Sequence, residues 1–199
     1  MANDLAKPMQ AMLTRAARTL PATTGETARY SRLQHTDGPT LILCDVSYSM
    51  ASPAGGRTRY DHLVEALKQV YRPEMSIIAF SAVAVSVARP EELPHPSGGT
   101  AIHAALAEAS KRRPAATLVI SDGEPNEGTE DLAISIADQM TGRIDVIYCG
   151  PDNNAKAIKF LNRLAKVGAG SCVHHSWSAP GQPRLAHTIQ KLLLGGPSS

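Results

Sequence analysis

The stretch DVSYS, residues 45–49, places one carboxylate and two hydroxyls at alternate positions directly after the apolar run LILC. Asp45, Ser47 and Ser49 are poor residues for the core of a strand, and all three side chains offer oxygen ligands. Hard oxygen ligands select Mg²⁺, Mn²⁺ or Ca²⁺ over zinc. The stretch therefore predicts a cation site at the point where a buried strand ends.

Two further segments place oxygens where they can reach the same site. Asp122 lies in ISDGEP at the end of a second apolar run, and Thr100 follows PSGG, whose two glycines allow a sharp turn. In a doubly wound sheet, ligands bind beyond the carboxyl ends of the strands, where the strand order reverses. We therefore expect three separate loops to meet at one rim, and we expect Thr100 also to cap the helix that it opens.

The chain around these motifs alternates between apolar runs typical of strands and segments of helical periodicity. The predicted strands are 40–46, 75–82, 83–88, 116–122, 143–150 and 171–175. The predicted helices are about 60–71, 100–113, 129–140, 158–168 and 185–193. The second and third strands are close enough in sequence to form a hairpin. The pattern predicts an α/β fold: a doubly wound, mostly parallel central sheet with one antiparallel edge strand and helices on both faces.

We expect this sheet to form a single domain over residues 39–195. Residues 1–38 are predicted to be an N-terminal extension that packs on the domain. The extension holds an amphipathic helix at 3–20 and a short edge strand at 28–34. The tail, 196–199, is expected to be loose.

Composition limits the classes of function. With 199 residues, 43% of them apolar and 19% charged, the chain is typical of a globular protein. A net charge of +2 without a basic, aromatic stripe argues against nucleic acid, and the lack of eighteen consecutive apolar residues argues against a membrane span. Three widely separated cysteines, with no continuous apolar centre near the N-terminus, favour a cytoplasmic protein. An organelle transit peptide is the alternative for the N-terminal segment.

The three pieces DVSYS, GGT and SDG, in this order and at these element boundaries, resemble the metal-ion-dependent adhesion site of a von Willebrand factor type A (vWA) domain. The resemblance covers roughly residues 39–194 and is closest to stand-alone, intracellular bacterial members of the family. It implies that three hydroxyls touch the metal and that two carboxylates hold it directly or through water. These residues are Ser47, Ser49 and Thr100 for the hydroxyls, and Asp45 and Asp122 for the carboxylates.

The resemblance also implies a function without catalysis. Neutral hydroxyls quench little of a cation's charge, so a carboxylate from another protein, an Asp or a Glu, is the natural last ligand. Bacterial relatives of this size commonly work beside ATPases or in stress and defence systems, which suggests an adaptor. Tyr48 departs from the family pattern, which usually has a small residue between the two serines. This departure bears on the type of partner rather than on the metal.

Two alternatives remain open from the sequence. A Mg²⁺-dependent phosphoryl hydrolase would use Asp45 as its nucleophile, but Ser47 stands where those enzymes place a second carboxylate. A structural scaffold with a silent metal site is the other alternative. We interpret His174 and His175 as structural, because neighbours on a strand point to opposite faces. The loop that follows Asp122, residues 124–127, is a candidate for shaping the choice of partner.

Overall fold

The computed structural model describes residues 37–177 and 184–194. The helix predicted at 3–20, the edge strand predicted at 28–34 and the predicted tail at 196–199 all lie outside these ranges. The boundary of an N-terminal extension at residue 38 therefore stays a prediction.

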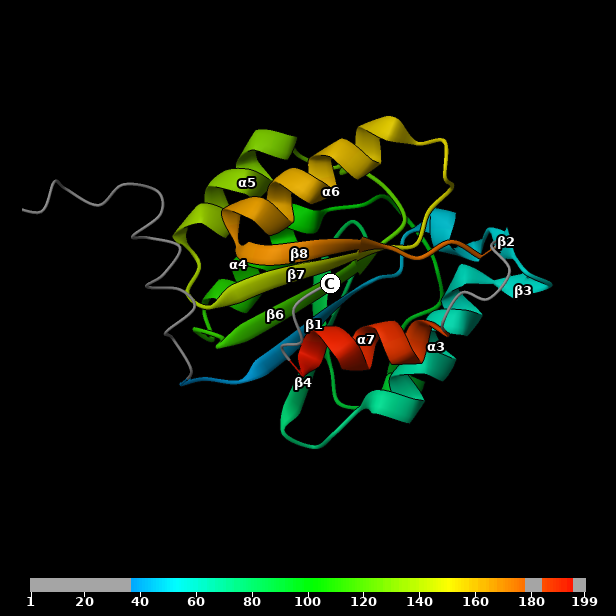
Figure 1. Cartoon of the computed structure of the whole chain (residues 1–199), viewed down its shortest axis with the longest axis horizontal. Coiled ribbons are helices and arrows are strands. Elements are labelled where there is room, and N and C mark those ends of the chain that lie inside the picture. The colour runs from blue at the N-terminus through cyan, green and yellow to red at the C-terminus, as the bar shows by residue number, and fades with distance from the viewer. Residues whose placement is uncertain (1–36, 178–183, 195–199) are drawn as a thin grey trace, which may run out of the picture. The chain divides into compact units, whose positions relative to one another are not determined.

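The described residues form a six-stranded sheet in the order β5-β4-β1-β6-β7-β8, in which only the β4–β5 pair is antiparallel (Figure 1). This confirms the predicted fold class, including the hairpin at one edge. The strands of this sheet are β1 (Thr40–Asp45), β4 (Met75–Phe80), β5 (Ala84–Val87), β6 (Ala116–Ser121), β7 (Arg143–Tyr148) and β8 (Ala169–His174).

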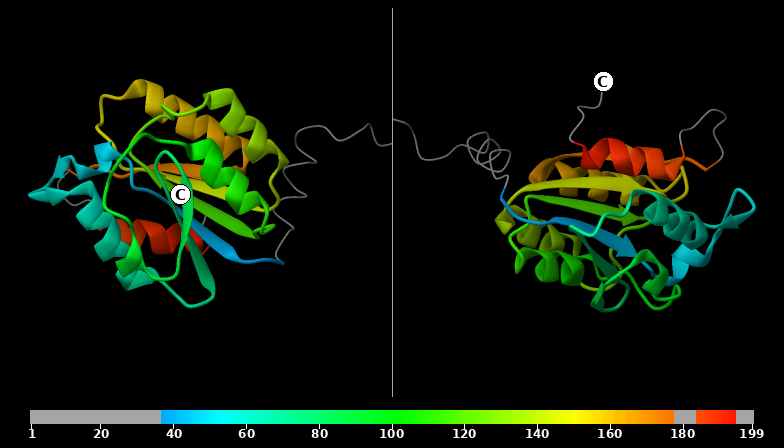
Figure 2. Two further views of the ribbon diagram at one scale, coloured as in Figure 1. Left: turned by 180° about the vertical axis from the view of Figure 1, so that it is seen from behind. Right: turned by 90° about the horizontal axis from the view of Figure 1, so that it is seen from below.

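Helices cover both faces of the sheet. In Figures 1 and 2, α4, α5 and α6 lie on one face, and α3 and α7 lie side by side on the other. Their bounds are α3 (Arg59–Val70), α4 (Ile102–Ser110), α5 (Glu130–Gln139), α6 (Ala155–Val167) and α7 (Leu185–Leu193). None of these described helices is both long enough and apolar enough to cross a membrane.

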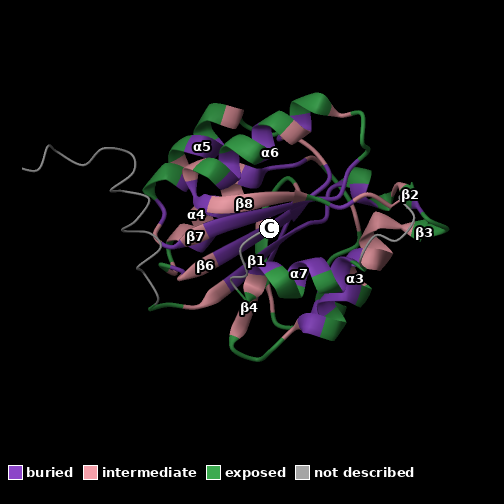
Figure 3. Cartoon of the chain, viewed as in Figure 1, coloured by how far each residue is buried: buried purple, intermediate pink, exposed green. Residues whose placement is uncertain are grey.

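The central strand β1 shows why its sequence is a continuous apolar run. Leu41 and Leu43 pack into the cluster beneath α4, α5 and α6, whereas Ile42 and Cys44 pack into the cluster beneath α3 and α7. All four side chains are fully buried, and the central strands β1, β6 and β7 are buried along nearly their whole length (Figure 3). Each large aliphatic side chain contributes roughly 1.5–3 kcal/mol by burial, so a strand covered on both faces has no position for a solvated side chain.

The segment between β1 and α3 is more ordered than the loop predicted there. It contains a 3₁₀ turn, η1 (Tyr48–Ala51), and a small hairpin of β2 (Pro53–Ala54) and β3 (Arg57–Thr58). Thr58 then caps α3 by accepting a hydrogen bond from the backbone N–H of Asp61, whose side chain accepts one in return. This capping box fixes Arg59 as the first residue of α3. A second 3₁₀ turn, η2 (Pro90–Glu92), follows β5.

A group of stacked rings lies where the chain leaves β8. His175 is only 4% exposed and packs edge-on against Trp177, with ring centroids 4.5 Å apart. His62 of α3 also packs on Trp177: the two rings are stacked, with centroids 4.7 Å apart. Burial, with smaller contributions from His62 and His174, lowers the pKa of His175 to about 4. The ring is therefore neutral in the folded protein at neutral pH.

This burial predicts a loss of stability in mild acid. Because the folded pKa of His175 lies below its unfolded value near 6.5, the unfolded chain binds the extra proton as pH falls from 6.5 towards 4. We expect the free energy of unfolding to drop by about 1–2 kcal/mol between pH 7.5 and pH 5 on account of this group. Urea denaturation of the wild type and of His175→Gln at both pH values measures it. An equal drop in both proteins would contradict the assignment.

Candidate cation site

The candidate site lies at the carboxyl ends of β1 and β6, which are neighbours in the sheet. From β1 the chain proceeds to β4 on one side, and from β6 it proceeds to β7 on the other, so the strand order reverses between them. Asp45 is the last residue of β1, and Asp122 follows the last residue of β6. The topology alone thus brings these two carboxylates to the rim where ligands of such sheets bind.

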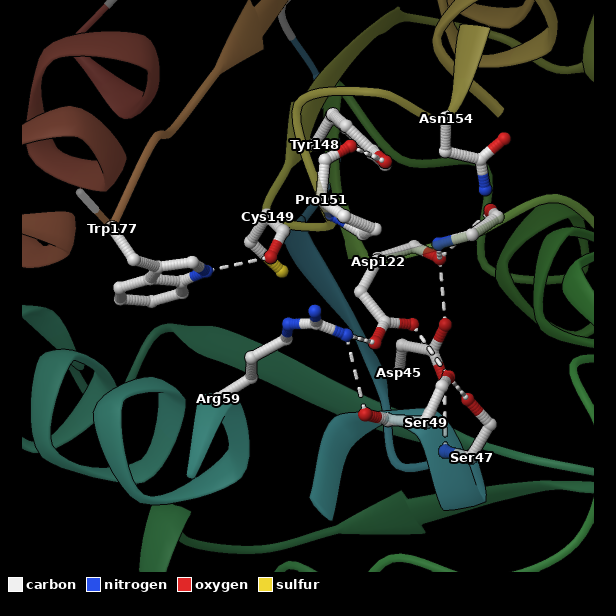
Figure 4. Close-up of polar contacts among 12 residues, drawn as sticks. Asp45, Ser47, Ser49, Arg59, Asp122, Tyr148, Cys149, Pro151, Asn154 and Trp177 are labelled. Carbon is white, nitrogen blue, oxygen red and sulfur yellow. Dashed lines mark hydrogen bonds and ion pairs between the residues drawn. The ribbon is translucent and has the colours of Figure 1, made fainter. Parts of the chain in front are cut away.

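A chain of short polar contacts links four of the five predicted ligands, Asp45, Ser47, Ser49 and Asp122 (Figure 4). The Oγ atoms of Ser47 and Ser49 lie 3.0 Å apart, and Ser49 Oγ donates a hydrogen bond of 2.7 Å to Asp122 Oδ1. The backbone N–H of Ser47 donates to Asp45 Oδ1 at 2.8 Å. Ser121, a residue that the sequence did not single out, donates a hydrogen bond of 2.6 Å from its Oγ to Asp45 Oδ2. Both carboxylate oxygens of Asp45 therefore accept a hydrogen bond.

Asp45 is an acid held in unfavourable surroundings. Its side chain is fully buried, and burial together with the nearby charge of Asp122 raises its pKa to about 7. Hydrogen bonds from Ser121 and Ser47 act in the opposite direction but do not outweigh these two causes. A buried carboxylate that lies beside a second carboxylate is destabilising for the fold and favourable for a cation.

Thr100 lines the same hollow but not as the helix cap that the sequence predicted. The cap position of α4 belongs to Ala101, which makes no side-chain capping bond, and the helix begins at Ile102. The prediction of a capping role for Thr100 is therefore wrong. Instead, the backbone N–H of Thr100 donates to Asn126 Oδ1 at 2.6 Å, so that the loop after β6 fixes the position of Thr100.

The two glycines before Thr100 have separate roles. Gly98 adopts a left-handed φ of +68°, which side chains rarely accept. Gly99 lies so close to the loop after β6 that a Cβ on it would come within 2.6 Å of Asn126 Oδ1. The pair thus lets the segment before α4 turn sharply and approach the loop that follows Asp122, as the PSGG motif indicated.

Ser49, Thr100 and Asp122 line a shallow hollow of about 270 Å³, whereas Asp45 and Ser47 are buried and are not part of its lining. Its walls come from η1, the first residue of α3, the segment before α4, the loop after β6 and the segment between β7 and α6. The lining residues are Ser49, Arg59, Thr100, Asp122, Gly123, Glu124, Asn126, Pro151 and Asn154. Glu124 and Asn126, which the sequence named as candidates for shaping the choice of partner, are therefore part of the hollow.

The oxygens present suit a small hard cation. Two oxygens bound at right angles to one Mg²⁺, at roughly 2.0–2.1 Å from the ion, lie about 2.9 Å from each other. The observed separations of 3.0 Å between the serine oxygens and 2.7 Å between Ser49 Oγ and Asp122 Oδ1 bracket that spacing. The donor set holds hydroxyl and carboxylate oxygens, the types that Mg²⁺, Mn²⁺ and Ca²⁺ prefer.

Arg59 is the charged residue at this site that the sequence analysis missed. Its Nη1 donates a hydrogen bond of 2.6 Å to Asp122 Oδ2 and one of 3.3 Å to the backbone carbonyl of Ser49. The ion pair is well buried, with side-chain exposures of 12% for Arg59 and 0% for Asp122. No spacing rule identifies Arg59, because its position depends on the η1 turn and the β2–β3 hairpin that precede it.

Other residues named from the sequence lie outside this set. Tyr48 is 75% exposed on η1, at the rim between the two serines. His174 forms an ion-pair contact of 3.1 Å with Asp152, whereas His175 packs against Trp177, so the two histidines have separate partners. A residue of α4 that the sequence analysis did not name, His103, lies against Gly128 and does not line the hollow.

Comparison with known proteins identifies the fold rather than a relative. No protein-family model matches the sequence, and no curated protein matches it. Solved structures do match. A von Willebrand factor type A protein from Catenulispora acidiphila aligns with a TM-score of 0.58 at 19% identity, over 70% of this chain and 38% of that one. The doubly wound sheet with its polar rim is therefore the vWA fold that the sequence predicted.

Two further structures cover most of this chain. The conserved hypothetical protein BatB from Bacteroides thetaiotaomicron aligns with a TM-score of 0.56 at 18% identity, over 79% of this chain and 100% of that one. The SpRpn10 VWA domain aligns with a TM-score of 0.51 at 14% identity, over 81% of this chain and 98% of that one. Identities this low show a shared fold, and the function rests on the residues of the site.

Proposed function

We propose that this protein is a non-enzymatic protein–protein interaction module. It binds a divalent cation, Mg²⁺ or else Mn²⁺ or Ca²⁺, at the carboxyl ends of β1 and β6, and through it an Asp or Glu of a partner protein. The proposed ligands are Asp45, Ser47, Ser49, Thr100 and Asp122. The observation that carries the proposal is the run of oxygen contacts of 2.7–3.0 Å from Ser47 through Ser49 to Asp122.

The distribution of charge around the hollow supports an acidic partner. The side chains nearest to one another are hydroxyls, and both oxygens of Asp45 already accept hydrogen bonds from Ser47 and Ser121. One oxygen of Asp122 is likewise paired with Arg59. A cation held in this way keeps much of its charge and attracts a further anionic oxygen, as hard cations do. The hollow is open, so a side chain from another protein can enter it.

The geometry around Asp45 also argues against the hydrolase alternative. An aspartate nucleophile must present a free oxygen to its substrate. Asp45 is fully buried, and each of its oxygens accepts a hydrogen bond. The residue two positions later, Ser47, has no carboxyl proton to give to a leaving group. We therefore assign Asp45 the role of orienting Ser47 and of holding a cation through coordinated water.

Exposed Tyr48 extends the proposed contact surface beyond the cation. Its backbone N–H donates to the carbonyl of Gly98, which ties η1 to the segment before Thr100. The exposed ring therefore stands on a fixed part of the rim. Rigid aromatic rings at such positions are typical anchors of interfaces. By analogy with the fold, an ATPase or a component of a stress or defence system is a fitting partner.

The proposal is tested in two steps. Isothermal titration with Mn²⁺ should show one site in the wild type and none in the double variant Asp45→Ala/Ser47→Ala. Proteins retained by the immobilised wild type in Mg²⁺ should then be released by EDTA and should not bind the double variant. Retention of the same proteins in EDTA and by the double variant would instead identify a scaffold with a silent site.

A further inference from the structure

Arg59 approaches the cation site from a position that does not favour a positive charge. It is the first residue of the twelve-residue helix α3, where the partial charge of the helix dipole is positive and acidic residues are preferred. Its side chain is only 12% exposed. Its Nε is buried and has no hydrogen-bond partner among the described residues. Each of these features costs free energy, so some other interaction must hold the side chain in place.

Among the described residues, the polar contacts of the Arg59 side chain are all with the cation site. Nη1 lies 2.6 Å from Asp122 Oδ2 and 3.3 Å from the carbonyl oxygen of Ser49, and Figure 4 shows the side chain reaching from α3 to both. The other carboxylate oxygen of Asp122, Oδ1, accepts from Ser49. The two oxygens of the Asp122 carboxylate thus have different partners: one faces the serines and the other faces Arg59. The guanidinium therefore leaves the serine side of the donor set free.

A count of formal charges shows what this arrangement changes. Asp45, Asp122 and Arg59 together carry −1. The charge of Glu124 in the lining is offset by Lys156, whose Nζ lies 3.6 Å from Glu124 Oε1. A divalent cation therefore brings the site to +1, and an added carboxylate brings it to zero. Without Arg59 the two acids carry −2, the cation brings the site to zero, and an added carboxylate leaves it at −1. The charge of Arg59 therefore weakens binding of the cation and strengthens binding of the added carboxylate. Both electrostatic effects are strong where side chains are buried.

We infer that Arg59 sets the balance of the site between its two ligands: it weakens binding of the divalent cation and strengthens binding of the carboxylate that completes it. The inference rests on the proposed function and adds a specificity-determining residue to it. Removing the charge of Arg59 should yield a protein that binds the metal more tightly and the acid more weakly.

The test uses Mn²⁺ as the cation and acetate as the carboxylate, with four forms of the whole protein. Arg59→Gln removes the charge, and Arg59→Lys keeps a charge without the guanidinium. Arg57→Gln is the matched control, because Arg57 is an exposed residue two positions away whose partner is Glu65 rather than Asp122. Electron paramagnetic resonance of free Mn²⁺ gives the affinity, with and without acetate. Circular dichroism checks that each variant folds.

We expect Arg59→Gln to bind Mn²⁺ about tenfold more tightly than the wild type, with Arg59→Lys and Arg57→Gln close to the wild type. Acetate should tighten Mn²⁺ binding in the wild type and less so in Arg59→Gln, since two ligands that favour each other do so reciprocally.

Three other results overturn the inference in distinguishable ways. Equal Mn²⁺ affinity in the wild type and Arg59→Gln would remove the inference and leave the proposed function standing. Weaker Mn²⁺ binding by Arg59→Gln would make Arg59 a residue that positions Asp122 for the metal. No Mn²⁺ binding by any of the four proteins would remove the proposed function and the inference with it.

Discussion

Replacing Asp45 by asparagine is expected to abolish binding of Mg²⁺ or Mn²⁺ and, in EDTA, to stabilise the protein. The folded pKa of Asp45 is about 7, well above its unfolded value near 3.8, because of burial and the charge of Asp122. The contribution of a group shifted in this direction is lost as pH rises through the folded pKa. At pH 8 the wild type therefore bears the full cost of a buried charge. Asparagine keeps the acceptor for the Ser47 N–H without that charge.

The two effects are measured on the same pair of proteins. Titration with Mn²⁺ at pH 8 should show at least about a hundredfold loss of affinity, since the cation loses a carboxylate. Urea denaturation in EDTA should show a gain of about 2 kcal/mol at pH 8, which grows from pH 4 to pH 7 and then levels off. Asp131→Asn, on the exposed side of α5, should change neither quantity. A loss of stability in Asp45→Asn would mean that the carboxylate stabilises the fold.

A substitution that raises the stability of the fold but abolishes cation binding distinguishes a binding site from a cluster of structural residues. The buried core of this domain is otherwise consistent: strands covered on both faces are apolar, and the starts of α3, α5 and α6 are capped by Thr58, Thr129 and Asn154. In the described part of the chain, buried polar atoms without a hydrogen-bond partner also occur at His103, Thr117, Arg143 and His175. At the cation site, however, a pair of buried carboxylates coincides with a helix-start arginine whose Nε is unpaired. Local conflicts in an otherwise consistent fold are typical of functional sites.

The positions of Asp45, Ser47, Ser49 and Asp122 were predictable because each follows directly on a buried strand. The apolar runs fix where β1 and β6 end, and parallel neighbours end at the same edge. Thr100 was placed by its glycines, but its capping role was wrong. A capping motif is a local pattern, whereas the N–H of Thr100 bonds to Asn126 on a different loop. The periodicity of apolar residues along the sequence does not predict a contact between two separate loops.

Arg59 was not predictable for a related reason. The sequence shows a Gly/Pro/Ser-rich segment before α3. Such a composition predicts a loop but not the path that the loop takes through space. The η1 turn and the β2–β3 hairpin give the segment its direction, and they carry the start of α3 to Asp122. A residue whose role depends on a tertiary path through an irregular segment leaves no spacing signal. The proposed ligands were therefore predictable from the sequence, whereas the net charge of the site was not.

The partnership of Asp122 with Arg59 should appear as a strong energetic coupling. Asp122→Ala in EDTA is expected to cost about 2 kcal/mol, because it leaves the largely buried guanidinium without its partner. Relief of the repulsion that Asp122 exerts on Asp45 offsets part of the loss. In the double variant Asp122→Ala/Arg59→Met the unpaired charge is gone as well. We therefore expect the double variant to be more stable than Asp122→Ala alone.

Urea denaturation of the wild type, both single variants and the double variant gives the coupling energy, which we expect to be about 2 kcal/mol. Arg57→Met in the Asp122→Ala background is the matched control and should recover nothing, because Arg57 is exposed and pairs with Glu65. A coupling near zero would mean that solvent compensates Arg59 once Asp122 is removed. The guanidinium would then contribute little charge to the site, and the acid, rather than the arginine, would be the residue that decides its electrostatics.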